Sequence, residues 1–166
     1  IELVQEENRE SILKNAIEPY KDIFDYIIVD SPPSMGILTL NSLVAANGVL
    51  IPLQSEYYAL EGLSHLLNSI KRIRKAFNSD LKLFGIVLTM FDKRNALSLS
   101  VDRDVRANLG KSVFDTTIPR NIKVSEAPSH GKPVLIYDVK CAGSYAYMEL
   151  AKEFLGKEKE FRWNED

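Results

Sequence analysis

The segment Tyr26–Gly36, which reads YIIVDSPPSMG, constrains the fold of this chain more than any other segment. Four apolar or aromatic residues run into Asp30, and two prolines follow, which interrupt strands and helices alike. A buried parallel strand over residues 25–30 would place Asp30 at the carboxyl edge of a sheet, where α/β proteins bind ligands. In nucleotide hydrolases a carboxylate at this place holds Mg²⁺, so the segment predicts half of a nucleotide site.

The other half of such a site is missing from the sequence. Nucleotide hydrolases of this kind cradle the phosphates with a glycine-rich loop of the form G-x-x-x-x-G-K-[ST]. None of the eight glycines stands in that pattern. The chain also begins with Ile1 rather than Met, so we expect it to be a portion of a longer protein.

Composition sets broad limits on the class of protein. The chain has 166 residues, a net charge of -2 and a single cysteine, Cys141, which fits a reducing cytoplasm. No apolar run reaches the length of a membrane span. Residues 93–140 hold 9 basic and 5 acidic side chains. Charge alone leaves open whether this stretch is a solvated surface or a face for a polyanion.

Strand-like and helix-like periodicity alternates along the chain. We expect helices over residues 5–18, 37–46, 59–77, 98–109 and 144–155, and strands over 25–30, 49–53, 83–90 and 113–118, with irregular structure over 120–143. This alternation predicts βαβ units and therefore an α/β fold with a doubly wound parallel sheet. We expect one domain over residues 1–155 and a charged, frayed tail over 156–166.

Four segments together resemble one protein family, the ParA/Soj chromosome- and plasmid-partitioning ATPases, a deviant P-loop class related to MinD. The similarity extends from about residue 11 to about residue 155. The segments are YIIVDSPPSMG at Tyr26–Gly36, EYYALEGLSHLL at Glu56–Leu67, VLTMFDKR at Val87–Arg94 and IPRNIKVSEAPSHGKP at Ile118–Pro133. The resemblance implies that strands and helices carrying the phosphate loop precede Ile1, and that the fold is of the P-loop hydrolase type with these first βα units missing.

The resemblance also implies roles for residues of a nucleotide site. Asp30 matches the carboxylate that orders Mg²⁺ and supports catalysis, although from the residue alone a cap for the turn that follows is the better explanation. The switch loop would contain Pro32, Pro33 and Gly36. The loops that frame adenine would contribute Met90, Asp92, Pro119, Arg120 and Asn121, although Met90 is otherwise an ordinary core residue.

Family members bind DNA without sequence preference as ATP-dependent dimers. The resemblance implies phosphate contacts from Arg103, Arg106, Lys111, Lys123 and Lys140, and also from Arg120. The loop Lys140–Gly143 departs from relatives, which often carry a further arginine there. The short acidic tail disfavours membrane binding. His65, His130 and Cys141 carry no expected catalytic role.

The expected function is therefore that of a portion of an ATP-dependent partitioning ATPase of the bacterial cytoplasm, associated with the nucleoid. A ParB-type centromere-binding protein would be its partner. ATP and Mg²⁺ would bind to the full-length parent, and neither is expected to bind tightly to this chain alone. Two alternatives stay open: a non-catalytic DNA- or partner-binding module, and an amidoligase-associated ATPase of the same fold group, which the SEAPSHGKP segment disfavours.

Overall fold

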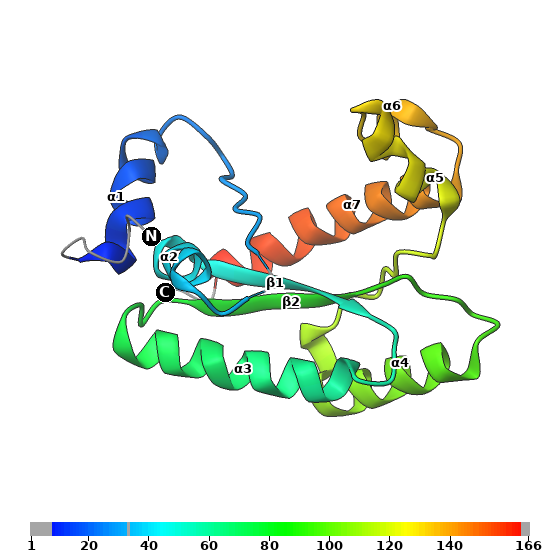
Figure 1. The fold of residues 1–166 in the computed structure, drawn as a ribbon, viewed down its shortest axis with the longest axis horizontal. Coiled ribbons are helices and arrows are strands. Elements are labelled where there is room, and N and C mark those ends of the chain that lie inside the picture. The colour runs from blue at the N-terminus through cyan, green and yellow to red at the C-terminus, as the bar shows by residue number, and fades with distance from the viewer. Residues whose placement is uncertain (1–7, 33, 164–166) are drawn as a thin grey trace. The chain divides into compact units, whose positions relative to one another are not determined.

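The computed structural model describes residues 8–32 and 34–163 (Figure 1). The chain forms two compact units. The first unit consists of the described parts of Ile1–Val49 together with Ser64–Leu83. The second unit consists of Leu50–Leu63 together with the described parts of Phe84–Asp166. Each unit is considered below by itself.

Helices make up most of the described chain, and they connect two strands. In chain order the elements are η2 (Arg9–Ser11), α1 (Ile12–Ile17), η3 (Glu18–Tyr20), α2 (Ile37–Ala45), β1 (Gly48–Gln54), α3 (Ala59–Ala76), β2 (Lys82–Thr89), α4 (Ala96–Leu109), η4 (Gly110–Ser112), α5 (Ile122–Glu126), η5 (Ala127–His130), α6 (Val134–Tyr137) and α7 (Ala142–Trp163). The predicted helices over 37–46, 59–77 and 98–109 are confirmed as α2, α3 and α4.

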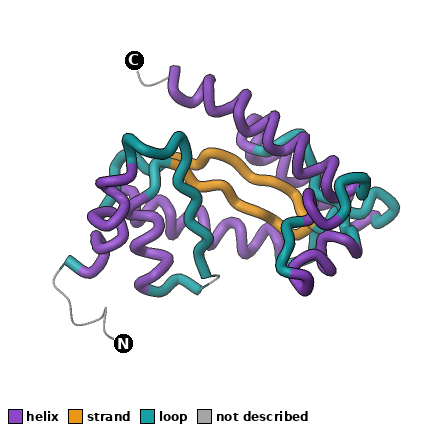
Figure 2. Tube along the Cα trace, turned by 90° about the horizontal axis from the view of Figure 1, so that it is seen from above, coloured by secondary structure: helices purple, strands orange, loops and turns teal. Residues whose placement is uncertain are grey.

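The strands β1 and β2 lie side by side (Figure 2). The N–H of Lys82 donates to the carbonyl of Asn47 at 3.0 Å, and the N–H of Ser55 donates to the carbonyl of Thr89 at 3.3 Å. Both strands therefore advance in the same direction, with the long helix α3 as their connection. The predicted strands over 49–53 and 83–90 and the predicted parallel sheet are thus confirmed.

The strand predicted over residues 113–118 is only partly formed. The segment runs parallel to β2 and meets it at one isolated bridge, Ile86 with Val113, and a second bridge joins Phe91 and Pro119 just beyond both segments. Between these bridges, the N–H of Phe114 donates to the carbonyl of Ile86 at 2.8 Å, and the N–H of Ile118 donates to that of Leu88 at 2.8 Å. The segment follows the sheet edge without the unbroken ladder that defines a strand.

The strand predicted over residues 25–30 is not formed, and this prediction was wrong. The segment is an irregular connection between α1 and α2, and the Ile28 side chain is 89% exposed. A strand needs a neighbouring backbone for its N–H and C=O groups. The sheet of the described residues consists of β1 and β2 and offers no pairing to this segment.

Two helical regions also differ from the predicted boundaries. The helix predicted over 5–18 is described only from residue 8 onward, as η2, α1 and η3, because residues 5–7 lie outside the described residues. The stretch 120–143 was predicted to be irregular, but it contains α5, η5 and α6. The final helix α7 was predicted to end at residue 155, yet it continues to Trp163.

The core of the second unit explains why α7 packs where it does. Val87 of β2 is buried together with Phe114 and Ile118, and α7 contributes side chains spaced by four residues that pack against this cluster: Ala146, Leu150 and Phe154. Farther along α7, the ammonium group of Lys157 lies 4.5 Å from the centre of the Phe114 ring. These contacts hold the helix beyond residue 155, so the predicted fraying of the tail does not begin there.

Candidate functional site

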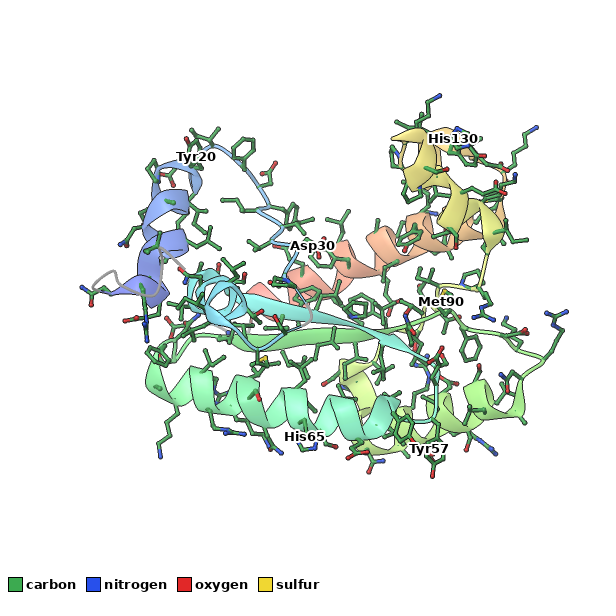
Figure 3. All side chains as sticks on the ribbon, viewed as in Figure 1. Tyr20, Asp30, Tyr57, His65, Met90 and His130 are labelled. Atoms are coloured by element: carbon green, nitrogen blue, oxygen red, sulfur yellow. The ribbon has the colours of Figure 1, made fainter. Side chains whose placement is uncertain are left out.

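Asp30 lies in the first unit, on the irregular segment that leads into α2 (Figure 3). Asp30 is exposed, and its carboxylate makes no hydrogen bond or ion pair with another residue that the structure describes. Within the same residues, no three His, Cys, Asp or Glu side chains gather into a metal site. A single exposed carboxylate fits Mg²⁺ that takes its remaining ligands from water and phosphate oxygens.

The backbone that follows Asp30 is attached to the start of α2. Gly36 is the N-cap of α2, and its N–H donates to the carbonyl of Ser34 at 2.9 Å. The hydroxyl of Thr39 is directed at the carbonyls of Pro32 and Ser34. Of the residues predicted for the switch loop, Pro32 and Gly36 are in this arrangement. Pro33 lies outside the described residues.

The two segments predicted to frame adenine are brought together in the second unit. The N–H of Phe91 donates to the carbonyl of Ile118 at 3.0 Å, and the N–H of Arg120 donates to the carbonyl of Phe91 at 3.2 Å. Met90, at the end of β2, adopts a left-handed backbone with φ of 52° and is 37% exposed. A left-handed backbone is uncommon for a residue other than glycine. With this exposure Met90 lies outside the core, so the interpretation of it as an ordinary core residue is not supported.

Asp92 has a defined charge partner. Arg94 donates to it through Nε at 3.0 Å and Nη2 at 2.9 Å, and also through its backbone N–H at 2.9 Å. These hydrogen bonds lower the pKa of Asp92 to about 2, with a smaller contribution from the charge of Arg120. The Asp92 carboxylate is therefore ionised at neutral pH, and its hydrogen bond from the N–H of Arg94 stabilises the turn that follows β2.

Asn121 is held at the start of α5. Its Oδ1 accepts from the N–H of Lys123 at 2.9 Å, so Asn121 is the N-cap of this helix. The first turn of α7 approaches closely at Gly143, where an added Cβ would lie 2.3 Å from Cγ2 of Val124 and 3.6 Å from Cβ of Asn121. The sequence interpretation missed Gly143 as a residue that shapes this region, because its only local signal was its position before a helical pattern.

Ser144 is a second residue that the sequence interpretation missed. Its hydroxyl is buried and lies 3.1 Å from the carbonyl of Val134 and 2.6 Å from that of Asp138. Cys141 is the residue before α7, and its Sγ accepts from the N–H of Ser144 at 3.4 Å. The end of α6 and the start of α7 are therefore connected through Ser144, and Cys141 has a capping contact.

The five basic residues predicted to contact DNA all lie in the second unit but differ in their surroundings. Arg103, Lys111 and Lys140 are exposed. Arg106 is instead bonded within the protein, because it donates to Asp102 Oδ1 at 2.7 Å and to the carbonyl of Phe114 at 2.9 Å. Its place as a phosphate contact is therefore not supported by the geometry.

The ammonium group of Lys123 already has a carboxylate partner within the protein. Its Nζ donates to Glu126 Oε2 at 2.9 Å and lies 5.6 Å from the centre of the Tyr137 ring. The hydrogen bond to Glu126 raises the pKa of Lys123 and lowers that of Glu126. A phosphate group would therefore compete with Glu126 for this ammonium group.

The two histidines have different surroundings. The His130 ring stacks on Tyr137 with a centroid distance of 4.8 Å, and His65 is exposed on α3 (Figure 3).

Among the helices of the described residues, none combines the length and apolar character needed to cross a bilayer.

Comparisons with known proteins identify the family. A protein-family model described as an AAA domain matches residues 1–83, half of the chain. The chromosome partitioning protein ParA of Caulobacter vibrioides is 49% identical over 162 residues, which cover 96% of this chain and 61% of that protein. The chromosome-partitioning ATPase Soj of Treponema pallidum is 50% identical over 158 residues, covering 95% of this chain and 62% of that protein.

Solved structures agree on the fold. A crystal structure of cobyrinic acid a,c-diamide synthase from Mycobacterium smegmatis with bound ADP and magnesium has a TM-score of 0.76 and 35% identity, covering 95% of this chain and 57% of that one. The fold is thus of the P-loop hydrolase type. The chain spans about three fifths of the length of the curated relatives it matches. It belongs to the ParA/Soj family of partitioning ATPases.

Proposed function

We propose that this chain is the portion of a partitioning ATPase that supplies the Mg²⁺ ligand and the base-binding loops. The observation that carries the proposal is the pair of backbone hydrogen bonds that hold the loop after β2 against residues 118–120, with Asn121 directly after them. These are the two segments that the family resemblance assigns to adenine, and they lie 3.0 Å apart at their closest backbone pair, Phe91 and Ile118.

The chain's own residues would divide the work of binding the nucleotide. Met90 and Pro119 present apolar surface for a ring, and both are at least partly exposed. Because Oδ1 of Asn121 already accepts from Lys123, the Nδ2 group is the part of that side chain left to donate to a base. Asp30 would hold Mg²⁺, which when bound neutralises charge on the phosphates during attack of water on the γ-phosphate.

The phosphate cradle itself would come from sequence outside this chain. Both curated relatives are longer than the chain by about two fifths of their length, which leaves room for the glycine-rich loop that the printed sequence lacks. Hydrolysis is therefore proposed for the full-length protein, and tight binding of ATP and Mg²⁺ is not proposed for the chain alone.

We further propose that the full-length protein acts as an ATP-dependent dimer on DNA, with a ParB-type centromere-binding partner, in the bacterial cytoplasm at the nucleoid. The exposed side chains of Arg103, Lys111 and Lys140 support a phosphate-binding face. Arg120 is also exposed, whereas Lys123 would have to exchange Glu126 for a phosphate.

Two alternative functions can be distinguished from this proposal by experiments on the full-length protein. A non-catalytic DNA- or partner-binding module would keep the basic surface and bind no nucleotide. An amidoligase-type enzyme is suggested by the similarity to the cobyrinic acid a,c-diamide synthase from Mycobacterium smegmatis, which is 35% identical. The partitioning proteins are closer in sequence, at 49% and 50% identity, and they favour the first proposal.

The experiment is to express the full-length gene product and to measure ATP hydrolysis and DNA binding together. The proposal predicts Mg²⁺-dependent hydrolysis and DNA binding that requires ATP and weakens steeply with salt. DNA binding that is indifferent to ATP would favour the non-catalytic module. Hydrolysis that depends on an amide donor and a carboxylate substrate would favour the amidoligase.

A further inference from the structure

The short helix α2 carries three buried polar side chains, Thr39, Asn41 and Ser42. A buried polar group needs a hydrogen-bond partner, so the partners of these three show what the helix is attached to. Of the three, Thr39 is the residue whose hydrogen-bond partners lie on the backbone that follows Asp30. All the contacts described below lie within the first unit.

Thr39 is attached to the backbone that follows Asp30. Its Oγ1 lies 2.5 Å from the carbonyl of Ser34 and 3.2 Å from the carbonyl of Pro32, and the residue is 8% exposed. A hydroxyl has a single proton to donate, so the two carbonyls share it. Pro32 is two residues from Asp30, and its position therefore limits where the carboxylate can lie.

Asn41 is attached to the opposite side of the helix. Its Nδ2 donates to the carbonyl of Arg9 at 2.7 Å and to that of Ile37 at 3.0 Å, and its Oδ1 accepts from the N–H of Leu13 at 3.0 Å. Two residues apart on an α-helix are separated by about 200° around the axis. Thr39 and Asn41 therefore bond to different segments on different sides of α2.

The C-terminal end of α2 is fixed as well. Nδ2 of Asn78 lies 2.9 Å from the carbonyl of Leu43, 3.2 Å from that of Val44 and 2.8 Å from that of Ala46. Carbonyls at a helix end lack partners within the helix, and this amide satisfies them. With Asn41 and Asn78 bonded, α2 is a fixed support from which Thr39 holds the backbone after Asp30.

We propose that Thr39 is a positioning residue for Asp30, through its hydrogen bonds to the carbonyls of Pro32 and Ser34. The inference rests on the proposed function, since it assumes that Asp30 holds Mg²⁺ in the full-length protein. Loss of the Thr39 hydroxyl frees this backbone, so the carboxylate reaches its metal-binding position for a smaller fraction of the time. The affinity for Mg²⁺ falls as a result.

The test compares Thr39→Val with Thr39→Ser and Ser42→Ala in the full-length protein. Valine keeps the shape of threonine and removes the hydroxyl, whereas serine restores it. Ser42 is a matched control, because it is also buried in α2 but its Oγ bonds to the carbonyl of Leu38 in the same helix, at 2.9 Å. Within the part of the chain that the structure describes, the Ser42 hydroxyl makes no hydrogen bond to the backbone that follows Asp30.

The first measurement is hydrogen exchange of the Gly36 and Ile37 amides without nucleotide. We expect faster exchange in Thr39→Val than in Ser42→Ala, with Thr39→Ser like the wild type. The second is the Mg²⁺ concentration that gives half-maximal ATP hydrolysis, which we expect to rise about fivefold to tenfold in Thr39→Val, as for the loss of one net hydrogen bond. We expect less than a twofold change in the other two variants.

Equal behaviour of Thr39→Val and Ser42→Ala in hydrogen exchange would overturn the inference, as would an unchanged Mg²⁺ requirement in Thr39→Val. A general loss of stability would speed hydrogen exchange equally in Thr39→Val and Ser42→Ala, and that outcome would count against the inference. If the wild type itself shows no Mg²⁺-dependent hydrolysis, the proposed function fails. Hydrogen exchange still decides whether Thr39 holds this backbone.

Discussion

Phe91 and Ile118 share a backbone hydrogen bond of 3.0 Å, from the N–H of Phe91 to the carbonyl of Ile118. The carbonyl of Phe91 then accepts from the N–H of Arg120 at 3.2 Å. Main-chain bonds therefore fix the loop after β2 against the segment that leads into α5. The separation of these two loops depends little on side chains, so substitutions of their exposed residues should change ligand contacts more than structure.

Gly143 provides a test of how α7 packs against α5. In Gly143→Ala the added methyl would lie 2.3 Å from Cγ2 of Val124, and we expect a loss of about 1–3 kcal/mol in the free energy of unfolding, as for other overpacked sites. Gly156→Ala is the matched control in the same helix, since nothing lies within 4 Å of its added methyl. There we expect a gain of about 0.5–1 kcal/mol. Urea unfolding of both variants measures the difference, and equal changes would contradict the close approach at Gly143.

Asp92 should titrate well below an ordinary aspartate. Hydrogen bonds from Arg94 lower its pKa from 3.8 to about 2. In Arg94→Gln the pKa should rise toward 3.8, because the charged donor is lost. A carboxyl pKa that is lower in the folded state contributes stability above the unfolded pKa, and that stability is lost as the pH falls from about 4 to about 2. Carbon-detected NMR titration of the Asp92 carboxyl in both proteins measures it, and identical curves would rule out the pairing.

Arg103 and Arg106 both lie on α4, but their substitutions should affect different properties: DNA binding for Arg103 and stability for Arg106. Arg106 is bonded to Asp102 and to the carbonyl of Phe114, so Arg106→Gln should lower the free energy of unfolding by roughly 1.5–3 kcal/mol. Arg103 is exposed, so Arg103→Gln should leave stability unchanged. In the full-length protein it should reduce the slope of log K against log salt for DNA by about 1. An unchanged salt slope for Arg103→Gln would remove it from the DNA-binding face.

The chain of 166 residues should not bind ATP tightly by itself, because its sequence contains no phosphate cradle. Isothermal titration with ATP and Mg²⁺ should show no binding in the micromolar range, whereas the full-length protein should bind. Micromolar, Mg²⁺-dependent binding to the isolated chain would mean that the phosphates have a site that the family resemblance does not supply.

The sequence predicted the elements whose partners lie within the chain. The apolar pattern of β1, β2 and α3 is explained by mutual packing, and their predicted boundaries agree with the structure to within two residues. Residues 26–29 have the same apolar character, yet Ile28 is 89% exposed. An apolar pattern indicates that a segment is suited to a buried strand. The strand forms only where a neighbouring backbone pairs with its N–H and C=O groups.

Motifs in the sequence predicted which segments of the candidate site lie together, whereas contacts that depend on packing were not predicted. The segments VLTMFDKR and IPRN were predicted to lie together, and the structure brings them together through backbone hydrogen bonds. Arg106 was grouped with the DNA contacts because an arginine on a helix surface gives no sign of its partners. Thr39, Gly143 and Ser144 act through contacts with backbone or neighbouring side chains, and such contacts leave no pattern in one sequence.

The most direct test of the central claim is the Mg²⁺ dependence of ATP hydrolysis by the full-length protein with Asp30→Asn. Asp25→Asn is the control, because Asp25 is also an exposed carboxylate of the same irregular segment. If Asp30 holds the metal, Asp30→Asn should reduce the rate at saturating ATP by about tenfold or more, which corresponds to about 1.4 kcal/mol of barrier. It should also raise the Mg²⁺ requirement, because the metal loses a charged ligand. Asp25→Asn should match the wild type. Equal rates and equal Mg²⁺ requirements for the two variants would contradict the account.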